Sequence, residues 1–235
     1  MTNSTLAAGR SATHKVAHGL RCTVLAGVFF AVTLAVSAAP PAAADFGTQT
    51  PTASARQLAD WVLSTHDNAG TEFIIVDKKA ATVYVFDSKA RLSGSSPVLL
   101  GAAAGDDSVP GIGDRPLSQV RPEERTTPAG RFVAERGRNA QGEDVVWVDY
   151  DAAVSMHRVR TNNPLERRLE RLATPSVADK RISYGCINVP QAFYESHIRP
   201  VFATHVAVVY VLPEIKSWQQ VFGVDRMTAN RATRP

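Results

Sequence analysis

The chain has 235 residues, of which 44% are hydrophobic, 7% aromatic and 20% charged. This composition is typical of a globular protein and excludes a disordered chain, a collagen and a disulfide-stapled mini-protein. The net charge is +4, but residues 1–44 hold three basic residues and no acidic one, which leaves 23 basic against 22 acidic residues in the rest. A nearly neutral chain without a basic run predicts no nucleic-acid partner.

The N-terminal segment has the order of an export signal. Residues 1–21 are polar and basic, residues 23–36 form an uncharged apolar run, and small residues follow up to Ala44. This order predicts a secretory signal peptide over residues 1–44, and therefore an exported protein of the periplasm or cell-envelope space. The alternative is a retained membrane anchor over residues 22–39, an apolar stretch at the short end for a span.

Residues 45–70 are predicted to form a linker and a short helix over 51–65, and residues 213–235 a C-terminal tail. Strands are predicted over 72–76, 81–86, 97–101, 131–135, 145–150, 152–157 and 204–212. Helices are predicted over 164–172, 190–198 and 214–224. The Gly- and Pro-rich residues 102–130 are predicted to form a long loop. Many short strands with few helices predict a mainly β domain, a sandwich or a barrel, rather than a parallel α/β sheet.

Removal of residues 1–44 would leave one cysteine, Cys186. An unpaired cysteine in an oxidising compartment is an inert buried residue, a linker between chains or a nucleophile. Cys186 follows Gly185 and precedes the predicted helix over 190–198, so we expect it at a helix N-terminus. Free backbone N–H groups there would stabilise a thiolate and the oxyanion that forms when the sulfur attacks a carbonyl.

Three further side chains are expected to complete this site. His157 ends a predicted strand and is the candidate base that takes the thiol proton. Ser183 and Asn188 flank the turn and are expected to fix its geometry through side-chain hydrogen bonds. The remaining histidines show no HxH or HExxH spacing, so no metal is predicted.

The run Ser183–Asn188 (SYGCIN), preceded by a histidine, resembles the signature of the L,D-transpeptidase catalytic domain. In that family a His and a spacer are followed by Ser/Thr-His-Gly-Cys-hydrophobic-Arg/Asn. The resemblance covers about residues 71–212 and includes Thr127–Phe132, which is similar to the family's Thr-Pro-x-Gly-x-Phe segment. It implies an L,D-transpeptidase-like β-sandwich or barrel as the catalytic domain.

The resemblance also implies a reaction, acyl transfer between peptidoglycan stem peptides without a cofactor. Cys186 would attack the carbonyl of the third stem residue, release the terminal D-Ala and form a thioester, with His157 as the base. An amine of a second stem peptide would then take the acyl group. The backbone N–H groups near Tyr184, Gly185 and Cys186 would form the oxyanion hole, and carbapenems would acylate Cys186.

The chain departs from the family pattern at three places. Tyr184 stands where the family has a second His, Arg158 stands where it often has Gly, and the spacer is longer. The extra residues, within 158–182, form either a wall that shapes acceptor choice or an exposed insertion without catalytic consequence.

Other functions remain open on the sequence alone. An L,D-carboxypeptidase or L,D-endopeptidase would use the same thiol, and a non-catalytic cell-wall-binding module could use the same fold. A sortase-like enzyme is another alternative, in which Arg199 would be the required arginine. The Thr-x-Thr-Cys turn of such enzymes is absent from this sequence. Papain-like enzymes place Cys before His, the reverse of the order in this chain.

Overall fold

The computed structural model describes residues 43–224. Nearly all of the predicted signal peptide, the proposed anchor over 22–39 and the last residues of the tail lie outside the described residues. Within residues 43–224, no helix has the length and apolar character needed to cross a bilayer.

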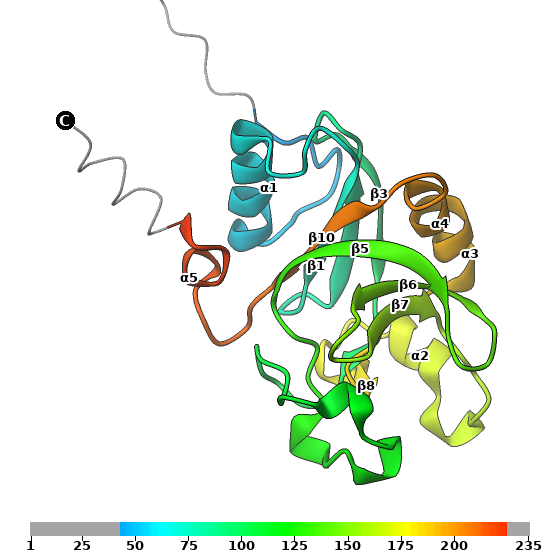
Figure 1. The fold of residues 1–235 in the computed structure, drawn as a ribbon. Coiled ribbons are helices and arrows are strands. Elements are labelled where there is room, and N and C mark those ends of the chain that lie inside the picture. The colour runs from blue at the N-terminus through cyan, green and yellow to red at the C-terminus, as the bar shows by residue number, and fades with distance from the viewer. Residues whose placement is uncertain (1–42, 225–235) are drawn as a thin grey trace, which may run out of the picture. The chain divides into compact units, whose positions relative to one another are not determined.

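The described chain is built on a mixed eight-stranded sheet in the order β3-β2-β1-β10-β5-β6-β7-β9, beside a two-stranded sheet of β4 and β8 (Figure 1). The strands are β1 (Phe73–Asp77), β2 (Thr82–Phe86), β3 (Leu92–Pro97), β4 (Leu100–Gly101), β5 (Gly130–Arg138), β6 (Asp144–Asp149), β7 (Val154–Arg158), β8 (Arg181–Ser183), β9 (Ile187–Val189) and β10 (Ala207–Leu212). The α-helices are α1 (Ala53–Thr65), α2 (Arg168–Ala173), α3 (Gln191–Phe193), α4 (Arg199–Val201) and α5 (Trp218–Phe222). A π-helical turn, Tyr194–Ile198, joins α3 to α4. The prediction of a mainly β fold with short helices is confirmed.

The two edges of the large sheet are brought together by the chain that leaves β3. Leu99 forms an antiparallel bridge with Asn188 of β9, with a backbone hydrogen bond of 2.9 Å in each direction. The sheet therefore comes close to closing on itself, and the closure anchors the strand that follows Cys186.

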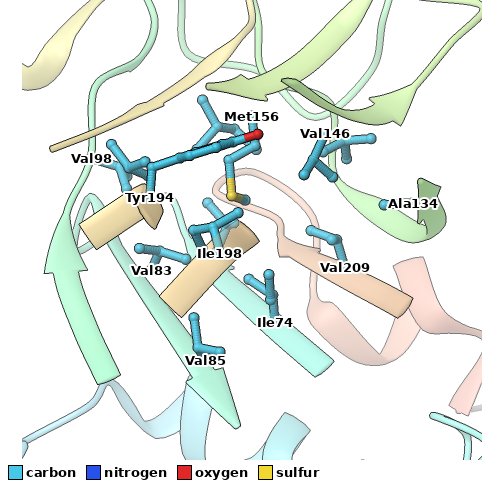
Figure 2. Close-up of a cluster of buried hydrophobic side chains, with 14 of the residues drawn as sticks. Ile74, Val83, Val85, Val98, Ala134, Val146, Met156, Tyr194, Ile198 and Val209 are labelled. Carbon is cyan, nitrogen blue, oxygen red and sulfur yellow. The ribbon is translucent and has the colours of Figure 1, made fainter. Parts of the chain in front are cut away.

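The central strands are buried on both faces, and alternate side chains enter two separate cores. Ile74 and Val76 of β1 join Val209 in a cluster that also holds residues of the α3–α4 helical segment (Figure 2). Phe73 and Ile75 join the other cluster, which packs against α1. This double burial explains why β1 and β10 are continuous apolar runs in the sequence.

Most predicted elements are found close to their expected bounds, and the long loop over 102–130 holds three 3₁₀ turns, over Ile112–Asp114, Leu117–Gln119 and Pro122–Glu124. The third strand, expected over 97–101, is wrong. Its region divides into β3 (Leu92–Pro97) and the two residues of β4. β3 is an edge strand of small polar residues, so it lacks the apolar alternation that marks a strand in a sequence.

Candidate active site

Parallel pairing of β7 with β9 brings the predicted site residues together. His157 lies directly opposite Asn188, and Cys186 immediately precedes β9. The side chains of His157 and Asn188 are buried, whereas Cys186 is half-buried. The sheet therefore places a partly accessible thiol beside a buried imidazole.

The prediction that Cys186 lies at a helix N-terminus is wrong. Ile187–Val189 forms β9, and α3 begins only at Gln191. Both apolar residues of β9 are β-branched and fully buried, which favours a strand over a helix. The sulfur is therefore stabilised by neighbouring side chains rather than by a helix dipole.

The Cys186 thiol has three polar neighbours. Its Sγ lies 3.7 Å from the Ser155 hydroxyl and 3.7 Å from the Ala153 carbonyl oxygen. Burial alone would raise the pKa of the thiol, but interactions with the His157 imidazole and with Ser155 outweigh it and hold that pKa below the ordinary value. A lowered pKa increases the fraction of thiolate, which is the nucleophilic form.

The contacts of His157 define which ring nitrogen carries the proton. Nδ1 lies 2.7 Å from the Arg158 carbonyl oxygen, which can only accept, so Nδ1–H is the donor. Nε2 of the neutral ring then has a free electron pair, and the Asn188 amide donates to it over 3.4 Å. His157 therefore has the tautomer that a general base acting through Nε2 requires.

The two residues that flank the turn make the hydrogen bonds expected of them. The Ser183 hydroxyl donates to the Cys186 carbonyl oxygen over 2.6 Å and accepts from the Gly185 N–H over 3.1 Å. The Asn188 amide donates to the same carbonyl oxygen over 3.2 Å. The backbone on both sides of the sulfur is thus fixed by two side chains.

Thr127, the first residue of the Thr127–Phe132 motif, is hydrogen-bonded to this turn. The Thr127 hydroxyl is fully buried, donates to the Gly185 carbonyl oxygen over 2.8 Å and accepts from the Gly101 N–H over 2.9 Å. This residue therefore joins β4 to the turn that carries Cys186.

Gly185 cannot be replaced without displacing the turn. Its φ is +130°, and a Cβ at this position would lie 2.7 Å from the Thr126 carbonyl oxygen. We expect Gly185→Ala to lower the free energy of unfolding by about 1–3 kcal/mol, the usual cost of a strained backbone position. Urea unfolding measures this loss.

Gly142→Ala is the matched control, because Gly142 also has a positive φ (+78°) but has no atom within 4 Å of the added Cβ. Equal losses in the two variants would contradict the steric argument at Gly185.

Two backbone N–H groups remain available for an oxyanion. The Gly185 N–H is already bonded to Ser183, whereas those of Tyr184 and Cys186 have no acceptor within residues 43–224. Of the three amides expected to form an oxyanion hole, these two are therefore the candidates.

Tyr184 and Arg158, where the sequence departs from the family pattern, lie in different surroundings. Tyr184 is 39% exposed, lies under the Arg125 guanidinium at 4.1 Å from the ring centroid, and lines the cavity beside the sulfur. Arg158 instead bonds Glu195 over 2.6 Å and covers the Tyr194 ring at 4.1 Å. Tyr184 is thus part of the site, and Arg158 is a packing residue of β7.

A cavity of about 310 Å³ opens at the sulfur. Its lining combines the site residues with polar side chains of the segment that follows β7: Leu117, His157, Arg160, Asn162, Asn163, Glu166, Arg168, Ser183, Tyr184, Cys186 and Asn188. A second cavity, of about 470 Å³, is lined by Ala153, Trp147 and Tyr150 among others, and Cys186 is not one of its lining residues.

Two residues of the site, Ser155 and Arg168, were not predicted from the sequence. Ser155 precedes His157 by two positions in one strand, so strand periodicity alone predicts that both side chains face the sulfur. Arg168 gives no comparable signal, because its contact with Asn188 spans 20 positions. Arg199 pairs with Glu195 and is not part of the cavity.

Residues 43–224 contain no cluster of His, Cys, Asp and Glu side chains that could hold a metal ion. The site offers a thiol, a base and two amide donors, of Tyr184 and Cys186, that are unpaired among the described residues. These are the groups that acyl transfer through a thioester uses.

No protein-family model and no curated protein sequence matches the chain. Solved structures similar to it include the helical cell shape determining protein Pgp2 of Campylobacter jejuni, at 15% identity and a TM-score of 0.43 over 68% of this chain and 56% of that one. A mutant of the L,D-transpeptidase of Enterococcus faecium has 16% identity and a TM-score of 0.33 over 60% and 50%. An L,D-transpeptidase of Mycobacterium tuberculosis H37Rv has 15% identity and a TM-score of 0.36 over 60% and 57%. The chain spans about half the length of each of these structures.

Proposed function

We propose that this chain is an exported cysteine acyltransferase that acts on peptidoglycan stem peptides, as an L,D-transpeptidase. The observation that carries the proposal is the half-buried thiol of Cys186, with a lowered pKa, beside a His157 whose Nε2 is unprotonated in the neutral ring. The SYGCIN motif and its preceding histidine supply the substrate class by resemblance.

The first half-reaction forms a thioester. His157 Nε2 takes the thiol proton, and Cys186 Sγ attacks the carbonyl carbon of the third stem residue. The N–H groups of Tyr184 and Cys186 stabilise the oxyanion of the tetrahedral intermediate. When this intermediate collapses, the C–N bond to the terminal D-Ala breaks, and the leaving amine takes the proton from His157.

The second half-reaction transfers the acyl group. The amine of a second stem peptide attacks the thioester carbonyl and gives its proton to His157, and the thiol is regenerated with that proton. The acceptor must reach the thioester while the donor peptide is still bound. The cavity at the sulfur is where the acyl group would meet its acceptor.

The alternative functions differ from transpeptidation in the donor or acceptor of the acyl group, or in the absence of a thioester. Water as the acceptor makes the chain an L,D-carboxypeptidase, and an existing crosslink as the donor makes it an L,D-endopeptidase. A non-catalytic wall-binding module needs no activated sulfur, so the lowered pKa of Cys186 favours an enzyme.

The proposal extends to location and to inhibitors. Export to the periplasm or cell-envelope space, with residues 1–44 as the signal or residues 22–39 as an anchor, would bring the chain to its substrate. A carbapenem carries a strained amide, and its ring opening by Cys186 would give a thioester without a separate leaving amine.

Incubation with tetrapeptide muropeptides and mass spectrometry of the products tests the proposed function. Crosslinked dimers with loss of D-Ala support transpeptidation, and free tripeptide supports carboxypeptidase activity. No change in the substrate, together with a Cys186 that resists alkylation, would reject an enzyme and support a binding module.

His157→Ala is expected to lower the turnover rate by about two to four orders of magnitude, the range for loss of a general base. The same change removes the interaction that lowers the pKa of Cys186, so alkylation of the thiol should require a higher pH. The pH dependence of iodoacetamide labelling measures this shift. His205→Ala is the control, because His205 is exposed and pairs only with Glu72 and Thr204. An unchanged labelling profile in His157→Ala would contradict the pairing.

A further inference from the structure

Arg168 connects the inserted segment to the centre of the candidate site. It is the first residue of α2, in the longer spacer between His157 and Cys186. Its side chain is only 14% exposed, although it carries a charge. The guanidinium donates through Nη1 to Asn188 Oδ1 and through Nε to Glu166 Oε2. The insertion is therefore a wall of the site and not a remote appendage.

The orientation of the Asn188 amide decides which of its two polar atoms faces His157 Nε2. The Nδ2 group donates to His157 Nε2 over 3.4 Å and to the Cys186 carbonyl oxygen over 3.2 Å. Rotation of the amide by 180° would aim Oδ1 at these two acceptors and lose both hydrogen bonds. The Nδ1–H bond to the Arg158 carbonyl oxygen would keep the tautomer, so the rotated amide would place Oδ1 against the unprotonated Nε2, two electron pairs facing each other.

Arg168 opposes this rotation. A guanidinium only donates, so the atom of Asn188 that faces it must be the oxygen. Asn188 is fully buried, and its backbone is fixed by two hydrogen bonds with Leu99. Glu166 in turn holds the guanidinium at its Nε edge.

We propose that Arg168 is a positioning residue, which holds the Asn188 amide in the orientation that fixes both the His157 ring and the Cys186 backbone by hydrogen bonds. This role rests on the proposed function, and it gives the insertion a part in the chemistry itself. Arg168 acts through Asn188 and forms no bond with the reacting atoms.

Nitrogen-15 NMR of histidine side chains in the full chain tests the proposal, because the shifts of Nδ1 and Nε2 report which atom carries the proton and whether the other accepts a hydrogen bond. The wild type is expected to show the Nδ1–H form of neutral His157. Arg168→Met, which keeps the length of the side chain but not its donors, is expected to keep the Nδ1–H form but to move the Nε2 shift to that of a nitrogen without a hydrogen-bond donor. Arg168→Lys retains a cationic donor and is expected to restore most of the wild-type Nε2 shift.

Kinetics on muropeptides supply the second readout. We expect kcat of Arg168→Met to fall by about 10- to 100-fold, the range for loss of a group that orients a site residue, with KM changed less than twofold. Arg167→Met is the matched control, because Arg167 is exposed and pairs only with Glu170. A raised KM with unchanged kcat would mean that Arg168 binds substrate, and would overturn the proposal, as would an unchanged Nε2 shift in Arg168→Met.

The two readouts separate this proposal from the proposed function. The NMR measurement needs no substrate, so a chain that leaves muropeptides unchanged can still show or lack the dependence on Arg168. If Arg168→Met does not fold, as judged by thermal melting, the comparison of Arg168→Lys with Arg168→Gln, which keeps a neutral donor, decides the same question.

Discussion

Replacement of Cys186 with alanine is expected to abolish turnover and leave the fold intact. The sulfur is the only nucleophile in the site with a lowered pKa, and Ser183 and Ser155 have hydroxyls that no adjacent base activates. The side chain is half-buried and makes two weak contacts, both of 3.7 Å, so its loss should change the melting temperature little.

The measurement is product formation from tetrapeptide muropeptides by Cys186→Ala and wild type at equal concentration. Cys22→Ala is the control for the other cysteine in the sequence and should retain full activity. Activity in Cys186→Ala would show that another group attacks the substrate and would refute the thioester mechanism.

Lys78→Met is expected to cause the largest loss of stability. Lys78 is fully buried, and its ammonium group donates to Asp106 over 2.9 Å, to the Thr127 carbonyl oxygen over 2.9 Å and to the Gly105 carbonyl oxygen. Removal of one partner of a buried ion pair typically costs about 3–5 kcal/mol, because the other charge is left without compensation. We expect a loss of this size in the free energy of unfolding by urea.

Asp106 is the buried carboxylate that pairs with the Lys78 ammonium group. Burial alone would raise the pKa of Asp106, but N–H donors of Lys216 and Glu214, together with Lys78, lower it to about 2. The folded-state pKa is thus below the unfolded one, so this contribution to stability is present above pH 4 and is lost as the pH falls toward 2. Without Lys78 the carboxylate loses its main cation.

Lys79→Met is the matched control, since Lys79 is the exposed neighbour in the same turn. The double variant Lys78→Met/Asp106→Asn should lose less stability than the sum of the single variants, because the two groups interact directly. A loss below about 1 kcal/mol in Lys78→Met, the range of an exposed pair, would contradict this account. A folded Lys78→Met should also lose activity, because Thr127 supports the turn at Gly185.

The sequence predicted the residues of the site better than their surroundings. Pairing of β7 with β9 brings together the four predicted residues Cys186, His157, Ser183 and Asn188. The motif with its preceding histidine indicates that these residues share a site, but it does not show which strands pair. The prediction that Cys186 lies at a helix N-terminus was wrong. Pro190 indicates that a helical run begins there, but it does not show that the three residues before it form strand β9. Short strands of this kind are fixed by their partners and not by local preference.

Long-range contacts account for the rest. Lys78 stands in a hairpin turn, where a lysine normally faces solvent, and only the fold brings the 102–130 loop over it. Arg168 stands on a short amphipathic helix whose charged side chains, by local pattern, indicate the solvated face. Neither contact could be predicted from local sequence, because each joins residues at least 20 positions apart.

Intact-protein mass spectrometry after brief mixing with a tetrapeptide stem tests whether a thioester forms on Cys186. We expect an adduct with the mass of the substrate less D-Ala on wild type and none on Cys186→Ala. Hydroxylamine should remove this adduct, because it is a thioester. An acceptor amine added after mixing should discharge the adduct into a crosslinked product. Turnover of the tetrapeptide without any such adduct, or an adduct of equal amount on Cys186→Ala, would contradict the thioester mechanism.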